Sequence, residues 1–261
     1  MTEVDLVGAG VVVTGAGNGI GRALARRLAA EGARVVVNDL DGEACREVAE
    51  EIGGLALPGD AAAADAIDGL ISQSRDYLGE IDIFFANAGI ETGGRDSDED
   101  WQRSWDVNVM SHVRAFRTLA PEWLERGRGR FIPTVSAAGL LTMLGAAPYA
   151  ATKHAALAHA EWLSATYGHR GITVQCICPQ GVRTAMVRLD TPEGQLILGP
   201  TLIEPEDVAE VVVASLADGR FLILPHPEVA NYYELRARHP DRWLQGMRGI
   251  QQEIDRSRQD L

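Results

Sequence analysis

Lysine is nearly absent from this sequence of 261 residues. Of its 24 basic side chains, 23 are arginines, and the single lysine is Lys153. An arginine presents a planar, permanently charged fork, whereas a lysine ammonium is a compact donor whose pKa shifts readily when it is buried. A chain that uses arginine elsewhere is expected to keep a lysine where a compact donor is needed, so Lys153 is a candidate functional residue.

Cysteine is also scarce, with three residues at Cys45, Cys176 and Cys178. An odd number in a chain of this length favours free thiols in a reducing cytoplasm over a disulfide framework. Cys176 and Cys178 alternate along an apolar stretch and are interpreted as core side chains. No metal site is expected there, because further ligands do not lie nearby in the sequence.

Long apolar runs are missing as well. The longest ones, such as residues 8–13 and 221–224, are far too short to span a bilayer, and the acidic start MTEVDLVG is not typical of a targeting segment. A formal net charge of −13 repels phosphate backbones and anionic membranes. We therefore expect a cytoplasmic protein with a small-molecule partner, and with no nucleic acid and no membrane as partners.

Apolar segments of strand length alternate with helical segments through most of the chain. The expected strands are residues 8–14, 33–38, 54–57, 81–86, 130–135, 172–178 and 220–224. This alternation predicts an α/β fold, a single Rossmann-like, doubly wound domain whose seven-stranded parallel sheet is flanked by helices. Residues 1–225 would form this domain, and residues 226–261, helical from Pro240 onward, a C-terminal extension of it.

The first expected strand leads directly into a glycine-rich turn. Residues 15–21 read GAGNGIG, and the amphipathic segment 22–31 follows. Strand, glycine turn and helix in this order place free backbone N–H groups and a helix N-terminus where a pyrophosphate can bind. The motif therefore predicts a dinucleotide site at the carboxyl ends of the strands.

The second expected strand ends at Asp39, which lies 24 residues after Gly15. A carboxylate at this place accepts hydrogen bonds from the ribose hydroxyls of the adenosine and repels a 2′-phosphate. Neither Asn18 nor Leu40 supplies the basic group that a phosphorylated ribose requires, so the sequence favours NAD over NADP. The alternative interpretation is that Asp39 caps the helix that begins near Asp41.

Tyr149 precedes Lys153 by four residues within the alanine-rich segment 148–168, which predicts a helix. The two side chains would then share one face of that helix. A phenol has an ordinary pKa of about 10, and an adjacent cation favours its ionised form, so the pair can exchange a proton near neutral pH. A chance helical pair is the alternative, and a chain with one lysine disfavours it.

Residues 95–100 contain a cluster of carboxylates. We interpret them as the first turn of a helix capped by Ser97, stabilised by the helix dipole, and not as a metal site. The helix that follows over residues 101–125 carries the polar residue Asn108.

The fifth expected strand, residues 130–135, contains Pro133. A proline removes a ladder donor, so a local distortion is expected there. Ser136 follows at the carboxyl end of this strand, where ligands of such folds bind.

Taken in order, these motifs resemble those of the short-chain dehydrogenase/reductase family. The resemblance is carried by the turn TGAGNGIG at residues 14–21, Asp60, the triplet Asn87, Ala88 and Gly89, Asn108, Ser136, Tyr149 and Lys153. It extends over residues 8–225. The chain departs from the family's pattern at residues 179–181, Pro-Gln-Gly, because the family more often has glycine directly after proline.

The resemblance implies four catalytic residues. Tyr149 would be the catalytic acid/base, and Lys153 would lower its pKa and bind the nicotinamide ribose. Ser136 would hold the substrate oxygen, and Asn108 would support a water between Lys153 and solvent. The implied cofactor is NAD, and its binding residues would be Gly15, Asn18, Gly19, Ile20, Gly21, Asp39, Leu40, Asp60, Ala61, Asn87, Ala88, Gly89, Tyr149, Lys153, Pro179, Gly181, Val182 and Thr184.

The implied activity is hydride transfer between NAD and a secondary alcohol or ketone. Apolar residues at 140–144 and 186–189 favour an apolar substrate that is steroid-, terpene- or lipid-like. One alternative is a 3-oxoacyl reductase that uses NADPH, which Asp39 and the acidic composition disfavour. Another is an inactive NAD-binding sensor or scaffold, which the presence of all four catalytic residues disfavours.

Assembly and the C-terminal tail raise two further expectations. Family members commonly pair through the helices that correspond to residues 101–125 and 148–168, so the resemblance implies a homo-oligomer, a tetramer or a dimer. In the tail, one helix face carries an apolar stripe that must be buried: Trp243, Leu244, Met247, Ile250 and Ile254. The stripe either packs on its own core or lies across a subunit interface or beside a partner's active site.

Overall fold

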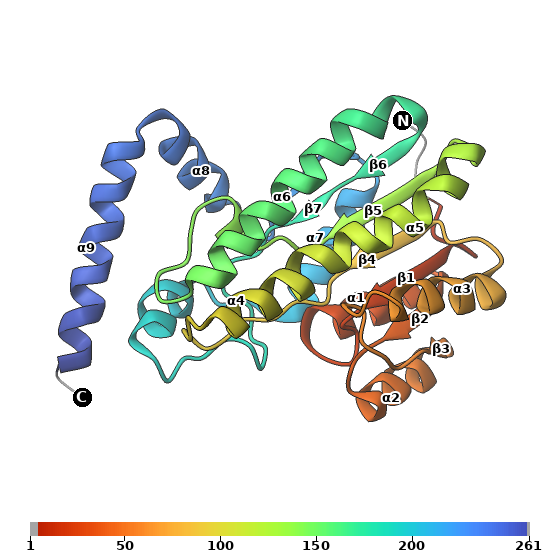
Figure 1. Cartoon of the computed structure of the whole chain (residues 1–261), viewed down its shortest axis with the longest axis horizontal. Coiled ribbons are helices and arrows are strands. Elements are labelled where there is room, and N and C mark those ends of the chain that lie inside the picture. Colours follow the sequence, from red (N-terminus) through yellow and green to blue (C-terminus); the bar gives the residue numbers. More distant parts are fainter. Residues whose placement is uncertain (1–4, 260–261) are drawn as a thin grey trace.

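A parallel sheet with strand order β3-β2-β1-β4-β5-β6 forms the middle layer of the structure, a computed structural model that describes residues 5–259 (Figure 1). The strands are β1 (Gly10–Thr14), β2 (Arg34–Asn38), β3 (Leu55–Ala56), β4 (Ile83–Ala86), β5 (Gly129–Pro133) and β6 (Ile172–Val174). The strand order reverses between β1 and β4, and in open α/β sheets such a switch point is where ligands bind.

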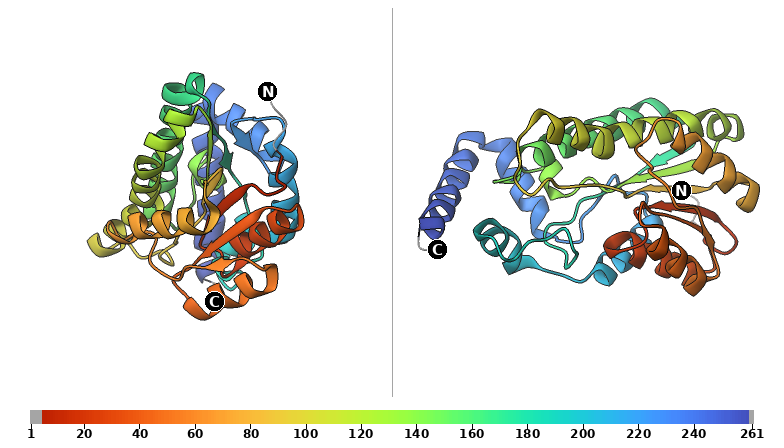
Figure 2. Two further views of the ribbon diagram at one scale, coloured as in Figure 1. Left: turned by 90° about the vertical axis from the view of Figure 1, so that its right-hand side faces the viewer. Right: turned by 60° about the horizontal axis from the view of Figure 1, so that its bottom comes forward.

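Helices cover both faces of the sheet (Figure 2). On one face lie α1 (Gly19–Ala30), α2 (Gly42–Ile52) and α7 (Pro205–Leu216), and on the other α3 (Ala66–Leu78), α5 (Ser111–Arg126) and α6 (Ala147–Tyr167). Successive side chains of β1 enter opposite cores, Val11 and Val13 on the first face and Val12 on the second. Burial on both faces explains why the strand has no polar alternation. The predicted doubly wound α/β fold is confirmed.

The expected seventh strand requires a correction. Within residues 5–259 the main sheet has six strands, and β8 (Leu222–Ile223) pairs with β7 (Cys176–Ile177) in a separate two-stranded parallel sheet. The expected strand 172–178 is thus divided at Gln175.

Pro133 provides the physical reason for this division. The Thr134 N–H donates to Ala86 in β4, and the Val135 N–H donates to Ile177 on the other side. Because donors alternate along a strand, the nitrogen of residue 133 faces the β6–β7 side, and proline has no N–H to give. The distortion predicted at Pro133 is confirmed.

The expected helix over residues 101–125 is divided into α4 (Asp98–Trp105), the π-helical turn η1 (Asp106–Met110) and α5. The prediction that Ser97 caps this segment is confirmed, since its hydroxyl accepts from the Asp100 N–H at 3.2 Å. Asn108 lies in the middle of η1 and is fully buried. Shorter turns are η2 (Ala137–Gly139), η3 (Gly168–Arg170), η4 (Gly194–Leu198) and η5 (Gly199–Thr201).

The C-terminal extension contains two helices, α8 (Glu228–Arg238) and α9 (Pro240–Gln259), of which the sequence predicted the second. Figure 1 shows α9 at one end of the molecule, beside α8. The apolar stripe is buried in part. Trp243 packs against the core and Ile254 is fully buried, whereas Leu244 and Ile250 remain 50% and 37% exposed. Within residues 5–259, no helix combines the length and apolarity needed to cross a membrane.

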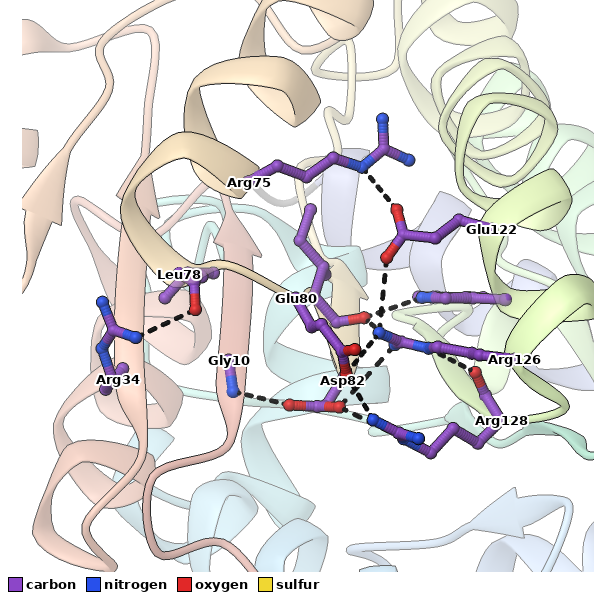
Figure 3. Close-up of polar contacts among 11 residues, drawn as sticks. Gly10, Arg34, Arg75, Leu78, Glu80, Asp82, Glu122, Arg126 and Arg128 are labelled. Atoms are coloured by element: carbon purple, nitrogen blue, oxygen red, sulfur yellow. Dashed lines mark hydrogen bonds and ion pairs between the residues drawn. The ribbon is translucent and has the colours of Figure 1, made fainter.

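An ion-pair network lies at the amino ends of the strands, where β1 and β4 begin (Figure 3). Arg126 of α5, 11% exposed, pairs with Glu80 at 3.0 Å and with Glu122 at 3.3 Å. The Asp82 carboxylate lies 3.7 Å from Arg126 and accepts from the Gly10 N–H at 2.9 Å. The network therefore joins α5 to the starts of two central strands, far from the carboxyl ends that form the site.

Candidate active site

A cavity of about 1800 Å³ opens at the carboxyl ends of the strands. Its dinucleotide end is formed by the glycine turn after β1, the end of β2 and the residues after β4. Its far end, called here the substrate end, is formed by residues 141–146, residues 184–198, α8 and α9. The start of α6 lies between the two ends, so the cavity brings together most of the predicted motifs.

The glycine turn is packed so closely that larger residues do not fit. A Cβ on Gly15, where φ is +61°, would lie 2.8 Å from the Ala88 Cα, and one on Gly21 would lie 2.1 Å from the Gly15 carbonyl oxygen. Asn18 stands at the N-cap of α1 without making a side-chain capping bond. The first N–H groups of α1 are therefore free of that side chain and can meet an anion.

Asp39 lines the cavity and is fixed by backbone donors. Its carboxylate accepts from the Gly17 N–H at 2.8 Å and from the Asp41 N–H at 2.9 Å. The N-cap of α2 is Asp41, which accepts from Glu43 and Ala44. The alternative that Asp39 is the helix cap is therefore wrong. Asp60, Ala61 and the exposed Leu40 also line this end of the cavity.

The Asn87 side chain connects neighbouring segments at the edge of the cavity by hydrogen bonds. Its amide donates to the carbonyls of Thr14 and Gly15 at 3.0 and 3.1 Å, and its oxygen accepts from the Thr134 hydroxyl at 2.9 Å. The side chain thus ties the glycine turn to the ends of β4 and β5. Sequence reasoning placed Asn87 at the site without predicting these bonds.

Ser136 is held in a strained backbone conformation. Its φ of 67° and ψ of 154° make it the one non-glycine residue with positive φ among residues 5–259. Such a conformation costs about 1–3 kcal/mol and persists where the surroundings impose it. The Ser136 hydroxyl donates to the Pro179 carbonyl at 3.3 Å and accepts from the Ala138 N–H at 3.2 Å.

Tyr149 and Lys153 lie one turn apart near the start of α6, as predicted. The Lys153 Nζ lies 5.5 Å from the centroid of the Tyr149 ring and donates to the Thr134 carbonyl at 2.8 Å. A Cβ on Gly89 would lie 3.1 Å from this Nζ. The ammonium is therefore enclosed between β5, the turn after β4 and the phenol.

Burial dominates the protonation of both side chains. Burial raises the pKa of the Tyr149 phenol, the nearby Ser136 hydroxyl lowers it, and the negative charge of Glu91 raises it. Burial likewise lowers the pKa of Lys153 to about 8. In the chain alone the Tyr149 pKa is therefore raised and not lowered, because burial removes the hydration that stabilises the phenolate.

Asn108 does not line the cavity. Its side chain accepts from the Ile90 N–H at 2.9 Å and donates to the Ile90 carbonyl at 2.9 Å and to the Thr152 hydroxyl at 3.0 Å. A Cβ on Gly89 would be 3.3 Å from its oxygen. Asn108 therefore lies behind Gly89, on the side where Lys153 also packs, and its amide fastens the loop after β4 to α6.

The predicted residues that follow β7 line the cavity, with one exception. Pro179, Val182 and Thr184 line the cavity, but Gly181 does not, and its carbonyl accepts from the Ile203 N–H at 3.1 Å. Sequence reasoning missed several side chains of the substrate end, namely Glu91, Gln180, Tyr232, Trp243 and Met247. The apolar stripe of the tail was the signal for the last two, although it did not reveal what they face.

The fold and the site together define an α/β protein with a dinucleotide-type turn and a tyrosine–lysine pair. Residues 9–194 match the short chain dehydrogenase family. The chain belongs to this family. It is 35% identical over 246 residues to 1-deoxy-11-beta-hydroxypentalenate dehydrogenase of Streptomyces exfoliatus. This match covers 89% of this chain and 87% of that protein.

Two further comparisons agree with this assignment. Meso-2,3-butanediol dehydrogenase of Serratia marcescens is 33% identical over 220 residues, which cover 80% of this chain and 87% of that protein. The crystal structure of a short chain dehydrogenase/reductase from Burkholderia phymatum in complex with NAD is similar with a TM-score of 0.83 and 27% identity. That match covers 93% of this chain and 96% of the solved one.

Proposed function

We propose that this chain is an NAD-dependent dehydrogenase that transfers a hydride between NAD and a secondary alcohol or ketone with an apolar skeleton. The observation that carries the proposal is the convergence of Ser136, Tyr149 and Lys153 on one cavity with the glycine turn and Asp39. The named relatives support it, since both are dehydrogenases. A screen of NAD reduction across secondary alcohols tests it directly.

The substrate end of the cavity supports an apolar substrate. Its lining includes Leu141, Met143, Met186, Leu196, Trp243 and Ile250. Ligand pockets are mostly apolar with a few placed polar groups, and this arrangement fits a hydrocarbon skeleton with one reacting oxygen. The substrate would lie between the Tyr149 phenol and α9.

The residues at the dinucleotide end fit NAD. The glycine turn leaves room that a Cβ would fill, and a Cβ on Gly19 would lie 2.9 Å from the Thr184 side chain, so the turn and the loop after β7 approach each other closely. The α1 N-terminus would hold the pyrophosphate, and Asp39 the adenosine ribose. When bound there, NAD supplies the hydride acceptor for oxidation of the alcohol.

Proton transfer would be carried out by the chain's own residues. The Ser136 hydroxyl and the Tyr149 phenol would both bind the substrate oxygen. In oxidation, the ionised Tyr149 takes the hydroxyl proton as the carbon loses its hydride, and in reduction the neutral phenol returns a proton to the oxygen. Lys153 would stabilise the ionised phenol, and the buried Asn108 would hold the loop that encloses Lys153.

Asp39→Asn is expected to raise the affinity for NADP relative to NAD about tenfold, because the change removes the repulsion of the 2′-phosphate. Fluorescence titration of both cofactors measures the ratio. Asp41→Asn is the matched control, since Asp41 caps α2 and does not line the cavity. Equal affinities of the unchanged chain for NAD and NADP would remove Asp39 as the selecting residue.

Alcohol oxidation is expected to accelerate from about pH 7 to about pH 9, because burial raises the Tyr149 pKa and the ionised phenol is the required base. Ketone reduction should change little over the same range, since it uses the protonated phenol, and a phenol with a pKa raised above its ordinary value of about 10 stays protonated there. Glu91→Gln should shift the oxidation profile to lower pH by removing a charge that raises the Tyr149 pKa. Initial rates of oxidation and of reduction measured across this pH range test both expectations. An oxidation rate that does not change with pH would contradict the assignment of Tyr149 as the base.

We also propose a cytoplasmic homo-oligomer, a tetramer or dimer, in which residues 1–225 form the catalytic domain and residues 226–261 extend it. Trp105 and Trp162, 43% and 55% exposed, support an interface along α4 and α6, and the three buried free cysteines agree with a reducing compartment. Light scattering should give two or four times the chain mass of 28.1 kDa. Trp162→Arg should reduce that mass, and a monomeric parent chain would refute the interface.

A further inference from the structure

Gln180 is placed at the boundary between the proposed reacting groups and the substrate end of the cavity. It follows Pro179, whose carbonyl accepts from the Ser136 hydroxyl at 3.3 Å and from the Ala137 N–H at 2.8 Å. Gln180 itself lines the cavity. Gln180 is therefore bonded directly to the residue whose carbonyl anchors the Ser136 hydroxyl.

The backbone of Gln180 is fixed by a buried histidine. Its N–H donates to Nδ1 of His226 at 3.1 Å, and Nε2 of His226 lies 2.7 Å from the Thr201 carbonyl. A carbonyl can only accept, so Nε2 carries the hydrogen and Nδ1 offers its lone pair to Gln180. His226 is 3% exposed, so the whole arrangement is shielded from water. Gln180 is thus held by a rigid support between η5 and α8.

The side chain of Gln180, in contrast, is not satisfied. Its amide oxygen is buried and makes no hydrogen bond to the described part of the chain. Buried polar atoms are usually paired, and each exception needs an explanation. Rotation about the terminal bond exchanges the amide oxygen and nitrogen, so this group can offer either an acceptor or a donor to a molecule in the cavity.

The residues around the Gln180 side chain indicate which kind of ligand group it can bind. The neighbouring wall is mostly apolar, as described above, and Glu91 and Glu193 are acidic residues of the same cavity. The Glu91 carboxylate already accepts from the Gly94 N–H at 3.1 Å, and Glu193 is paired with Arg258. Arg188 and Arg242 line the same end of the cavity, so charges of both signs are present, and the uncharged amide of Gln180 suits a neutral oxygen.

We propose that Gln180 hydrogen-bonds a second neutral oxygen of the substrate, and that the enzyme therefore prefers diols and hydroxyketones over simple secondary alcohols. This assignment rests on the proposed dehydrogenase function and specifies its substrate class. Gln180 acts as a specificity residue, and His226 as the residue that positions it.

The test compares cyclohexanol with cyclohexane-1,2-diol in the wild type, in Gln180→Leu and in Gln195→Leu. Gln195 is an exposed glutamine that does not line the cavity, so it is the matched control. The ratio of kcat/KM for diol over cyclohexanol should fall about five- to tenfold in Gln180→Leu, the loss expected for one neutral hydrogen bond. It should stay unchanged in Gln195→Leu, and the loss of kcat/KM in Gln180→Leu should be greater for the diol than for cyclohexanol.

A ratio unaffected by Gln180→Leu, or an equal loss for both alcohols, would overturn the proposal while leaving the dehydrogenase function intact. Binding is read separately, from the increase in Tm that each alcohol produces in the presence of NAD. The diol should raise the Tm of the wild type more than cyclohexanol does, and Gln180→Leu should abolish that excess. If no alcohol is oxidised, the proposed function fails, and the Tm comparison still decides whether Gln180 recognises the second oxygen.

Discussion

Tyr149→Phe is expected to lower the turnover of secondary alcohols by at least 10²-fold, and up to about 10⁴-fold, while NAD binding changes little. The substitution removes the phenolic oxygen that exchanges the proton and keeps the ring beside Lys153. Steady-state rates and a fluorescence titration of NAD measure the two effects on the same preparation.

Tyr167→Phe is the matched control for this experiment. Tyr167 is the last residue of α6, and its ring packs against Phe116 at a centroid distance of 5.5 Å, far from the cavity lining. The control should keep its rate. If Tyr149→Phe retained more than about a tenth of the wild-type rate, Tyr149 would not be the acid/base.

Lys153→Arg should lower kcat/KM by about 10²-fold or more, although it keeps the positive charge. The ammonium donates to the Thr134 carbonyl and lies against the Gly89 backbone, and the side chain is 2% exposed. A planar guanidinium is larger than this space, so it would displace the phenol or the loop after β4. Overpacking of this kind also destabilises a fold by about 1–3 kcal/mol.

Lys153→Met separates the loss of charge from the loss of shape. If charge alone mattered, Lys153→Arg would retain activity and Lys153→Met would not. The structure instead predicts that both variants are inactive, and that the Tm falls more in Lys153→Arg. Rates and thermal unfolding of both variants measured side by side provide the answer, and an active Lys153→Arg would show that a compact donor is not required.

The parts of the site that the sequence predicted depend on short-range patterns. The glycine turn lies between a strand and a helix, Asp39 ends the next strand, and Tyr149 precedes Lys153 by one helical turn. Each pattern fixes local geometry, and the strand order then brings the carboxyl ends together. The single lysine added information that no local pattern contains.

The parts that were missed depend on contacts between distant segments. The division of β6 from β7 follows from the place of Pro133 in the sheet, two residues beyond the last pair of β5 and β6, Phe131 with Val174, and such a register is a property of the assembled sheet. The raised Tyr149 pKa follows from burial by several elements. Likewise, α8 joins the core through the fully buried Val229, which carries no signal of its own in the sequence.

The backbone conformation of Ser136 lowers the stability of the fold, whereas the proposed activity requires its hydroxyl. Its left-handed conformation disfavours folding by about 1–3 kcal/mol, an appreciable share of the roughly 5–15 kcal/mol that keeps a typical domain folded. Glycine adopts the same backbone without this penalty but has no hydroxyl to place on the substrate. Selection for thermal stability alone would therefore favour glycine at position 136, and selection for the proposed activity keeps serine there.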